Sequence, residues 1–408
     1  MKKLLFFIFS VFLFFSCQHN PYKLKTYKFP KPVDTTTRPI EYQVKKTYEI
    51  GDVSATNEFP SARLNDFTQI DDSTFQATIN AENVPINTSP WYAFKIWSKQ
   101  TKSVYLKLYY VVHRHRYFPK ISYDGDNWER LDSTRITLTP DSLHAILKLD
   151  LTQKPLWIAG QEIQDHRRVG EWMNQWKANP VVTLGDAGES VQGRKMFFMD
   201  LSKGNHKNKP TVVVISRQHP PEVTGYFAMQ AFIETIIEKG ANNGFLDKYR
   251  VLVYPMMNPD GVDLGHFRHN TGGIDLNRDW AKYNQPEIKQ VTTHIVKEAK
   301  EGENEIVLGL DFHSTHYDVY YTFDDSVERK LPGFTKEWLS QIEKELELVD
   351  INEQPSGLNQ PISKGWFFKQ FGAEGIVYEI GDSTPRDFIK RKGEVSAVSM
   401  MDILKKMR

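Results

Sequence analysis

The sequence predicts an α/β protein in which helices cover both faces of a mixed, mostly parallel sheet, preceded by a smaller all-β sandwich. Two patterns predict this architecture. In the first part of the chain, short segments alternate polar and apolar residues, which is typical of strands with one solvated face. From about residue 162, apolar strand-like runs alternate with helix-length segments, which indicates a parallel sheet buried on both sides.

Residues 1–17 are predicted to be a signal peptide. Lys2 and Lys3 precede a mostly apolar run from Leu4 to Phe15, which Ser16 and Cys17 follow, and this run is too short to span a membrane. Cys17 is the only cysteine, so no intrachain disulfide is possible. The segment resembles a bacterial lipoprotein signal, in which the cysteine becomes the lipidated first residue. We therefore expect an exported cell-envelope protein that is anchored to a bacterial membrane through lipidated Cys17, with plain secretion as the alternative.

Residues 18–40 are polar and rich in proline and threonine, which predicts a poorly ordered tether. Residues 41–160 are predicted to form the β-sandwich. The turn pair Asp124-Gly125 supports this interpretation, as do three alternating segments at residues 74–79, 92–97 and 104–109.

Residues 161–408 are predicted to form the α/β domain. A helix is expected at about 162–176, and strand-like runs follow between 181 and 201. Later strands are expected at residues 211–216, 250–257, 306–312 and 375–380. They alternate with helices at about 222–238, 286–301, 335–347 and 391–407. Basic and acidic residues number 52 and 51, a balance that argues against nucleic acid as a partner.

Ionisable side chains stand at the carboxyl ends of three predicted strands. His219 and Glu222 follow the first of these, His313 follows the second, and Glu379 follows the third. In open α/β sheets, ligands bind at that edge. Two imidazoles and one carboxylate form the ligand set of a catalytic zinc whose fourth position is left to water. The sequence therefore predicts one Zn²⁺ per chain, held by His219, Glu222 and His313.

The His219-Pro220-Pro221-Glu222 segment is expected to form the turn between strand and helix. A residue before proline is pushed towards extended geometry, which keeps His219 out of the helix. The two prolines can fill the first helical positions, where a missing N–H costs little. Glu222 is then expected to begin the helix.

Further motifs follow in a recognisable order. They are Asn258-Pro259-Asp260-Gly261, Arg268-His269-Asn270, the segment from Gly272 to Trp280, Asp311-Phe312-His313-Ser314, and Tyr378-Glu379. With the His219–Glu222 segment, they closely resemble the zinc carboxypeptidase family, also called the M14 metallocarboxypeptidases. The resemblance is greatest to the cytosolic-carboxypeptidase-like branch, whose members carry a β-sandwich ahead of the catalytic domain. It implies that residues 161–408 form a zinc carboxypeptidase catalytic domain.

The resemblance also implies a role for each remaining site residue. Glu379 would be the general base for the attacking water, and Arg268 would face the developing oxyanion. Asn277 and Arg278 would bind the terminal carboxylate, to which the planar guanidinium is well matched. The implied substrate is a peptide with a free C-terminal carboxylate. Asp311 lies two residues before His313 and could orient an imidazole.

Several points stay open in the sequence. Many family members carry a mobile cleft tyrosine in the stretch before the base, but residues 351–372 contain none. Lys364 could select an acidic terminal residue or could be an ordinary solvated lysine. The same zinc site would also serve a murein-peptide carboxypeptidase or an amide deacylase. A catalytically silent binding protein that uses the β-sandwich is the alternative of another class.

Overall fold

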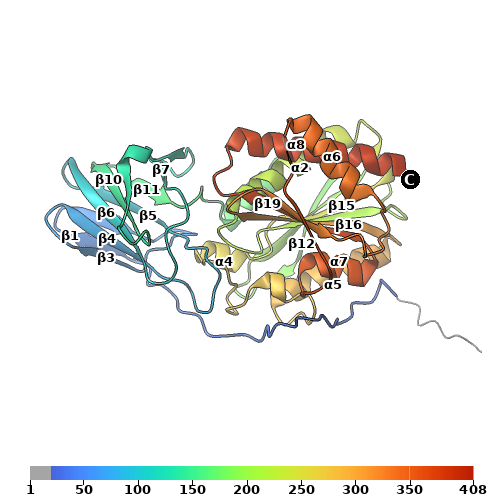
Figure 1. Cartoon of the computed structure of the whole chain (residues 1–408), viewed down its shortest axis with the longest axis horizontal. Helices are drawn as coiled ribbons and strands as arrows, with labels where there is room; N and C mark the ends of the chain where they lie inside the picture. The colour runs from blue at the N-terminus through green and yellow to red at the C-terminus, as the bar shows by residue number, and fades with distance from the viewer. Residues whose placement is uncertain (1–19, 349, 408) are drawn as a thin grey trace, which may run out of the picture.

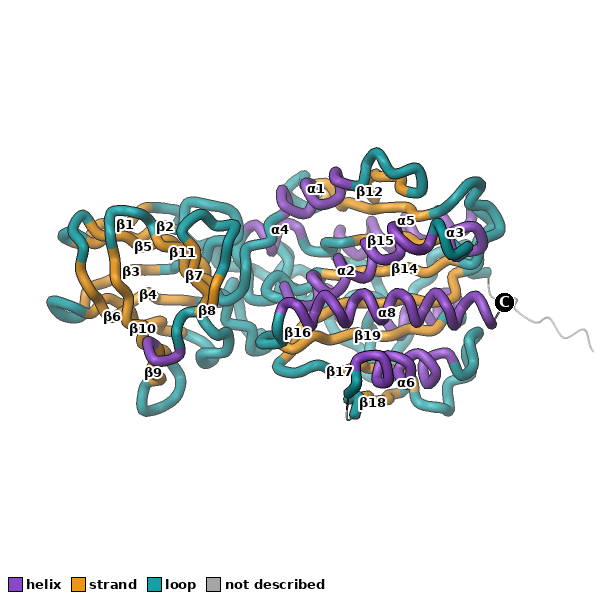
Figure 2. Tube along the Cα trace, turned by 90° about the horizontal axis from the view of Figure 1, so that it is seen from above, coloured by secondary structure: helices purple, strands orange, loops and turns teal. Residues whose placement is uncertain are grey.

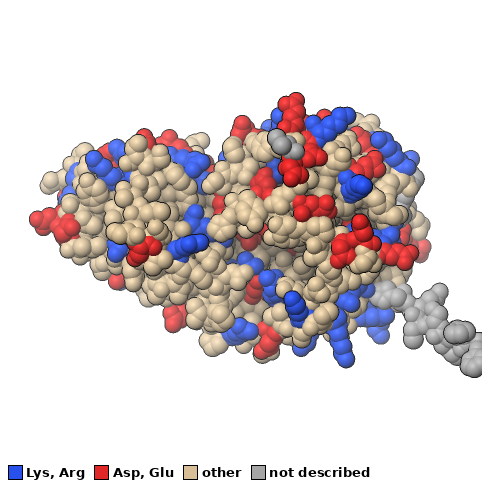
Figure 3. All heavy atoms as spheres, in the orientation of Figure 1, with Lys and Arg blue, Asp and Glu red and all other residues tan. Residues whose placement is uncertain are grey.

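The computed structural model describes residues 20–348 and 350–407, and it places a β-sandwich beside a larger α/β body (Figure 1). The predicted signal peptide and Cys17 lie outside the described residues. None of the helices in these two ranges combines the length and the hydrophobicity that a membrane span requires. Acidic and basic side chains are interspersed over the visible face of both bodies (Figure 3).

The β-sandwich consists of two sheets that pack around a shared apolar core. Among the described residues, one sheet has the strand order β1-β2-β5-β11-β7-β8 and the other the order β3-β4-β6-β10-β9. Alternation along β4 buries every second residue, as the sequence pattern predicts. The strands are β1 (Thr47–Ile50), β2 (Val53–Thr56), β3 (Asp66–Gln69), β4 (Thr74–Ile79), β5 (Ala93–Ser98), β6 (Lys102–Tyr110), β7 (Lys120–Ser122), β8 (Glu129–Arg130), β9 (Ile136–Leu138), β10 (Ala145–Leu151) and β11 (Leu156–Ala159).

The α/β body is built on a mixed sheet with the order β12-β13-β15-β14-β16-β19-β17-β18 in the described part of the chain. The central strands β15, β14, β16 and β19 run parallel. β12 and β13 pair antiparallel with their neighbours, and β17 pairs antiparallel with β19 but parallel with β18. The strands are β12 (Val182–Glu189), β13 (Lys195–Leu201), β14 (Thr211–Ser216), β15 (Arg250–Tyr254), β16 (Ile306–Thr315), β17 (Val319–Phe323), β18 (Glu353–Ser356) and β19 (Glu374–Gly381).

Helices cover both faces of this sheet. On one face lie α2 (Val223–Gly240), α6 (Phe334–Leu346) and α8 (Arg386–Met407), and on the other lie α5 (Pro286–Glu301) and α7 (Ser363–Phe371) (Figure 1). Seen from above, α8 lies over the strands β16 and β19 and runs in roughly the same direction (Figure 2). Shorter elements are α1 (His166–Gln175), α3 (Phe245–Lys248), α4 (Pro259–Asp263), and the 3₁₀ turns η1 (Ser133–Arg135) and η2 (Leu276–Arg278). The predicted fold class is confirmed.

Residues 20–40 pack against the α/β body, so the expectation of a poorly ordered tether is wrong for them. The N–H of Tyr27 donates to the carbonyl of Ala281 at 3.0 Å, and the N–H of Lys31 donates to that of Asn359 at 2.9 Å. Thr35 is almost fully buried, and its hydroxyl donates to the carboxylate of Asp279 in the α/β body. Polar composition alone suggested disorder, but these polar groups have specific partners.

Candidate active site

The metal-binding turn differs from its prediction in one respect. Pro220 and Pro221 form a turn ahead of α2 rather than its first helical residues, and α2 begins at Val223. Glu222 occupies the N-cap position but makes no side-chain cap hydrogen bond, because its carboxylate is directed at two imidazoles.

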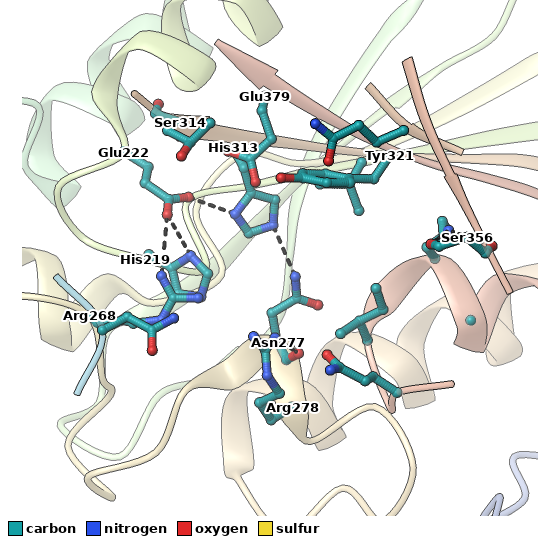
Figure 4. Close-up of a pocket in the computed structure, with 18 of the residues that line it drawn as sticks. His219, Glu222, Arg268, Asn277, Arg278, His313, Ser314, Tyr321, Ser356 and Glu379 are labelled. Carbon is teal, nitrogen blue, oxygen red and sulfur yellow. Dashed lines mark hydrogen bonds and ion pairs between the residues drawn. The ribbon is translucent and has the colours of Figure 1, made fainter. Parts of the chain in front are cut away.

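His219, Glu222 and His313 meet at the carboxyl edge of the sheet (Figure 4). The Nδ1 atom of His219 lies 2.7 Å from Oε1 of Glu222, and the Nδ1 atom of His313 lies 2.6 Å from Oε2. All three side chains are buried, and their donor atoms lie within 4.8 Å of one another. The lone pairs of an imidazole nitrogen and a carboxylate repel, so a proton or a metal ion must lie between them at these distances.

Two aspartates hold the outer nitrogens of the imidazoles. The Nε2–H of His219 donates to Asp275 at 2.8 Å, and the Nε2–H of His313 donates to Asp311 at 2.9 Å. Asp311 also accepts hydrogen bonds from Gln218 and the hydroxyl of Ser363. These contacts assign the proton of each ring to Nε2 and turn each Nδ1 towards Glu222. The sequence suggested this role for Asp311 but not for Asp275, although Asp275 lies within a motif that carries the resemblance.

The electrostatics of Glu222 and His313 favour a positive charge between them. Burial disfavours the charged form of His313, but Asp311 and Glu222 outweigh burial and raise its pKa well above its usual value. Burial also opposes the charged form of Glu222, whose pKa is nevertheless held well below normal by His219 and His313. Two imidazole nitrogens and a carboxylate are the donor set that zinc prefers at catalytic sites. The residues present therefore fit the metal that the sequence predicts.

Glu379 lies beside this cluster because β16 and β19 pair in parallel, with His313 opposite Glu379 in the register. Burial raises the pKa of Glu379, and the nearby carboxylate of Glu222 raises it further. Within the described part of the chain, the Oε2 atom of Glu379 is buried and has no hydrogen-bond partner. An unpartnered buried carboxylate is costly, which marks this group as one whose partner is a proton or a ligand.

Arg268 approaches the cluster from a loop. Its Nε–H donates to Asp275 at 2.9 Å, and its Nη1 atom lies 3.7 Å from the Glu222 carboxylate. Asp275 therefore holds both His219 and Arg268. This arrangement leaves the outer edge of the guanidinium at the cleft, where a developing negative charge would meet it.

Asn277 and Arg278 form part of η2 and differ in their exposure. The side-chain oxygen of Asn277 accepts the N–H of Ser363 at 3.0 Å, and its Nδ2 atom lies 3.4 Å from Nε2 of His313. Arg278 is more open, with 26% of its side chain exposed, and one of its N–H groups donates to the carbonyl of Asn277. Arg278 thus has donors free for a carboxylate, whereas the side-chain oxygen of Asn277 is already bonded to Ser363.

A cleft of about 820 Å³ contains every side chain predicted for the site. These are His219, Glu222, Arg268, Asn277, Arg278, His313 and Glu379. The structure brings them together from distant segments, and their individual roles stay predictions. The β-sandwich contributes residues 86–89 and Arg116 to the same cleft, and the N-terminal segment contributes Lys31.

Lys364 is neither a solvated lysine nor a free cation that could select an acidic terminal residue, which were the two possibilities that the sequence left open. It is buried, and its ammonium donates to the carbonyl of Thr322 and to the hydroxyl and carbonyl oxygens of Ser356. An ammonium has three protons, so these acceptors leave none for a substrate carboxylate. Lys364, which lies in α7, instead joins that helix to β17 and to the end of β18.

Tyr321 is a cleft residue that the sequence could not place. It lies on β17 opposite Val377, two residues before Glu379. Figure 4 shows its ring reaching across the cleft towards His313 and Glu379. Its neighbour Tyr320 is buried on the other side of the strand. The Tyr-Tyr pair was visible in the sequence, but which member faces the cleft depends on strand register.

Comparison with known proteins gives consistent results. A family model described as zinc carboxypeptidase, Peptidase_M14, matches residues 169–392, which is more than half of the chain. The chain is 33% identical to cytosolic carboxypeptidase 2 of Danio rerio over 130 residues, which cover 31% of this chain and 18% of that protein. It is 25% identical to cytosolic carboxypeptidase 6 of Caenorhabditis elegans over 258 residues, which cover 60% and 52%. Three of the curated relatives, cytosolic carboxypeptidase 2 of Danio rerio among them, are matched over less than a third of their own length.

Two solved structures are similar along most of the chain. A metallo-carboxypeptidase from Burkholderia cenocepacia aligns with a TM-score of 0.71 at 16% identity, covering 87% of this chain and 100% of that one. A metallo-carboxypeptidase from Pseudomonas aeruginosa, in complex with (2-guanidinoethylmercapto)succinic acid, aligns with a TM-score of 0.67 at 18% identity, covering 87% and 100%. At these identities, the likeness establishes a shared fold.

Proposed function

This chain belongs to the zinc carboxypeptidase family, and we propose that it is a zinc-dependent metallocarboxypeptidase that hydrolyses the C-terminal peptide bond of peptides. The observation that carries the proposal is the meeting of His219, Glu222 and His313 beside Glu379, whose buried Oε2 atom has no hydrogen-bond partner in the described part of the chain. The sequence motifs indicated a similarity to cytosolic carboxypeptidases, and the matches to these proteins support the proposal.

Different residues of the site perform different parts of the reaction. Zinc held by His219, Glu222 and His313 would supply a Lewis acid and lower the pKa of a bound water towards neutrality. Glu379 takes the proton from the attacking water and returns it to the leaving amine, a task that suits a carboxyl group whose pKa is raised. Arg268, fixed by Asp275, stabilises the negative charge that develops on the carbonyl oxygen.

Arg278 makes the enzyme an exopeptidase. Its exposed guanidinium lies in the same cleft as the metal ligands and can bind a carboxylate through two parallel hydrogen bonds. A substrate held in this way presents its last peptide bond to the centre of the cleft, whereas an internal segment has no carboxylate to offer.

A pair of substrates and two variants test this function. The purified protein should contain one zinc per chain and should cleave an N-blocked dipeptide with a free carboxylate, but not its C-terminal amide. Glu379→Gln should retain zinc and lose ~10²–10⁴-fold in kcat, the usual contribution of general acid–base catalysis. Glu374→Gln, at the other end of β19, is the matched control and should keep activity. Absence of zinc, or equal cleavage of the amide, would contradict the proposal.

We also propose that the enzyme acts in the bacterial cell envelope, anchored through lipidated Cys17. The charge pattern and short apolar run before Cys17 support this location. Labelled palmitate should be incorporated into the wild-type protein in cells and not into Cys17→Ser. Equal labelling of both proteins would contradict the anchor.

A further inference from the structure

The loop that carries Arg268 has little structure of its own. Residues 264–275, all of them described, contain no helix or strand and connect α4 to η2. Asp275 holds the guanidinium end of Arg268, but the backbone of the loop needs partners elsewhere to keep that side chain in place. The β-sandwich supplies these partners.

One carboxylate of the β-sandwich accepts three consecutive N–H groups of this loop. Glu82, in the connection between β4 and β5, accepts from Phe267 at 2.7 Å, from Arg268 at 3.0 Å and from His269 at 2.7 Å. Its side chain is 0% exposed. Bonds from N–H groups to a buried carboxylate are stronger than neutral hydrogen bonds, and three of them fix both position and orientation.

A second anchor comes from the apolar side of the same loop. Phe267 is fully buried and belongs to the core of the β-sandwich, although it lies in the chain of the α/β body. The guanidinium of Arg63 lies 5.7 Å from the centre of its ring. Asn83 bonds to the ring of His269 at 2.7 Å and to the carbonyl of Gly273 at 3.1 Å. The residues on either side of Arg268 are therefore held by the sandwich.

The groups around Glu82 favour the charged form of its carboxyl group. Burial alone would raise the pKa of Glu82, but His266, Arg63 and the N–H of His269 outweigh burial and hold that pKa below its usual value. Its oxygens accept from the three N–H donors that face them.

We propose that Glu82 is a positioning residue for Arg268, and that the β-sandwich thereby completes the active site. Glu82 fixes the backbone at Arg268 while Asp275 fixes its guanidinium, so the side chain is held at both ends. This inference rests on the proposed function, because it concerns the stabilisation of charge during peptide hydrolysis. Glu82 touches neither the metal ligands nor Arg278, so its effect should appear in kcat rather than in zinc binding or substrate affinity.

Glu82→Gln is the sharpest substitution, because it keeps the shape of the side chain but turns one acceptor into an NH₂ group that faces the N–H donors. A misplacement of ~1 Å can cost ~10²-fold in rate, so we expect kcat to fall by ~10–100-fold. The KM for an N-blocked dipeptide and the zinc content should change by less than about twofold, since Arg278 and the ligands are held elsewhere.

Glu162→Gln is the matched control. Glu162 is also a poorly exposed carboxylate, and it pairs with Arg386 at 2.8 Å, far in sequence from the Arg268 loop. Hydrogen exchange gives a readout independent of activity. Amides 267–269 should exchange faster in Glu82→Gln and at the wild-type rate in Glu162→Gln. Glu82→Asp, which keeps the charge, serves as the test if Glu82→Gln does not fold.

A double-mutant cycle separates positioning from general loss of stability. In an Arg268→Ala background, Glu82→Gln should change kcat by less than about twofold, because the group it positions is gone. An undiminished effect in that background, or a kcat for Glu82→Gln equal to wild type, would overturn the inference while leaving the proposed function intact. A wild-type protein that holds zinc but cleaves no peptide would overturn both.

Discussion

Replacing Gly225 with Ala tests how the metal site is assembled. Gly225 lies in the first turn of α2, three residues after Glu222, and its N–H donates to the hydroxyl of Ser314 at 2.8 Å. The helix approaches β16 so closely here that a Cβ on residue 225 would lie 2.1 Å from the carbonyl oxygen of His313, 2.6 Å from its carbonyl carbon and 2.9 Å from its nitrogen. Only glycine permits this approach.

The size of the effect follows from these distances. Real Cβ contacts essentially never fall below 3.0 Å, so α2 and β16 must separate by about 1 Å to admit the methyl group. Overpacking of this kind costs roughly 1–3 kcal/mol of stability. The shift also separates Glu222 from His313 by about half of a metal–ligand bond, which is ~2.0–2.2 Å. We expect zinc affinity to fall by about a hundredfold, or ~2.8 kcal/mol.

Competition with a chromophoric chelator would measure zinc affinity, and thermal unfolding would measure stability. Gly240→Ala is the matched control, because residue 240 ends the same helix and its Cβ would meet only side-chain atoms, at 3.1 Å and beyond. It should bind zinc as the wild type does. If Gly225→Ala binds zinc with unchanged affinity, the close contact between α2 and β16 does not set the distance between the ligands.

Three further outcomes are expected. Asp275→Asn weakens the orientation of His219 and should lower zinc affinity by ~10–100-fold; an unchanged chelator competition curve would exclude this role. Lys364→Met should leave the ratio of cleavage of C-terminal Glu to C-terminal Leu unchanged, because the ammonium is already bonded to Ser356, and a fall in that ratio would restore a role in specificity. Burial raises the pKa of Glu287 to about 7 from 4.5, so the stability that its neutral form confers is complete below pH 4.5 and is lost as the pH rises through 7. Glu287→Gln stays neutral, so it should raise the Tm relative to wild type at pH 8 but not at pH 4.5; equal shifts at both would refute the assignment.

The sequence predicted the parts of the site that follow from strand order. His219, His313 and Glu379 each end or follow an apolar run, and parallel strands bring such residues to one edge of a sheet. The motif resemblance then supplied Arg268 and Arg278, which periodicity could not have found. His219, His313 and Glu379 line one cleft because the strands before them are strongly patterned, whereas Arg268 lies on a loop and Arg278 on a 3₁₀ turn.

The sequence could not predict features that depend on contacts between distant segments. Gly225 matters because of a helix-to-strand distance, and Tyr321 faces the cleft because of the register between β17 and β19. Lys364 lies in a polar loop sequence and looked solvent-exposed, yet carbonyl and hydroxyl groups from two other segments surround it. Residues 20–40 show the same limit, since their partners lie far along the chain.

The two parts of the chain look separable by pattern, because period-two alternation ends near residue 160 and strand–helix alternation begins soon after. The contacts argue otherwise. Phe267 completes the core of the sandwich, and Glu82 completes the backbone hydrogen bonding of the loop that carries Arg268. Each part thus contains a buried group whose partner belongs to the other, and a buried carboxylate or aromatic side chain stripped of its partner is costly. Removing the sandwich would expose Phe267 and free the Arg268 loop at once, so stability and catalysis should fail together in a truncated α/β body.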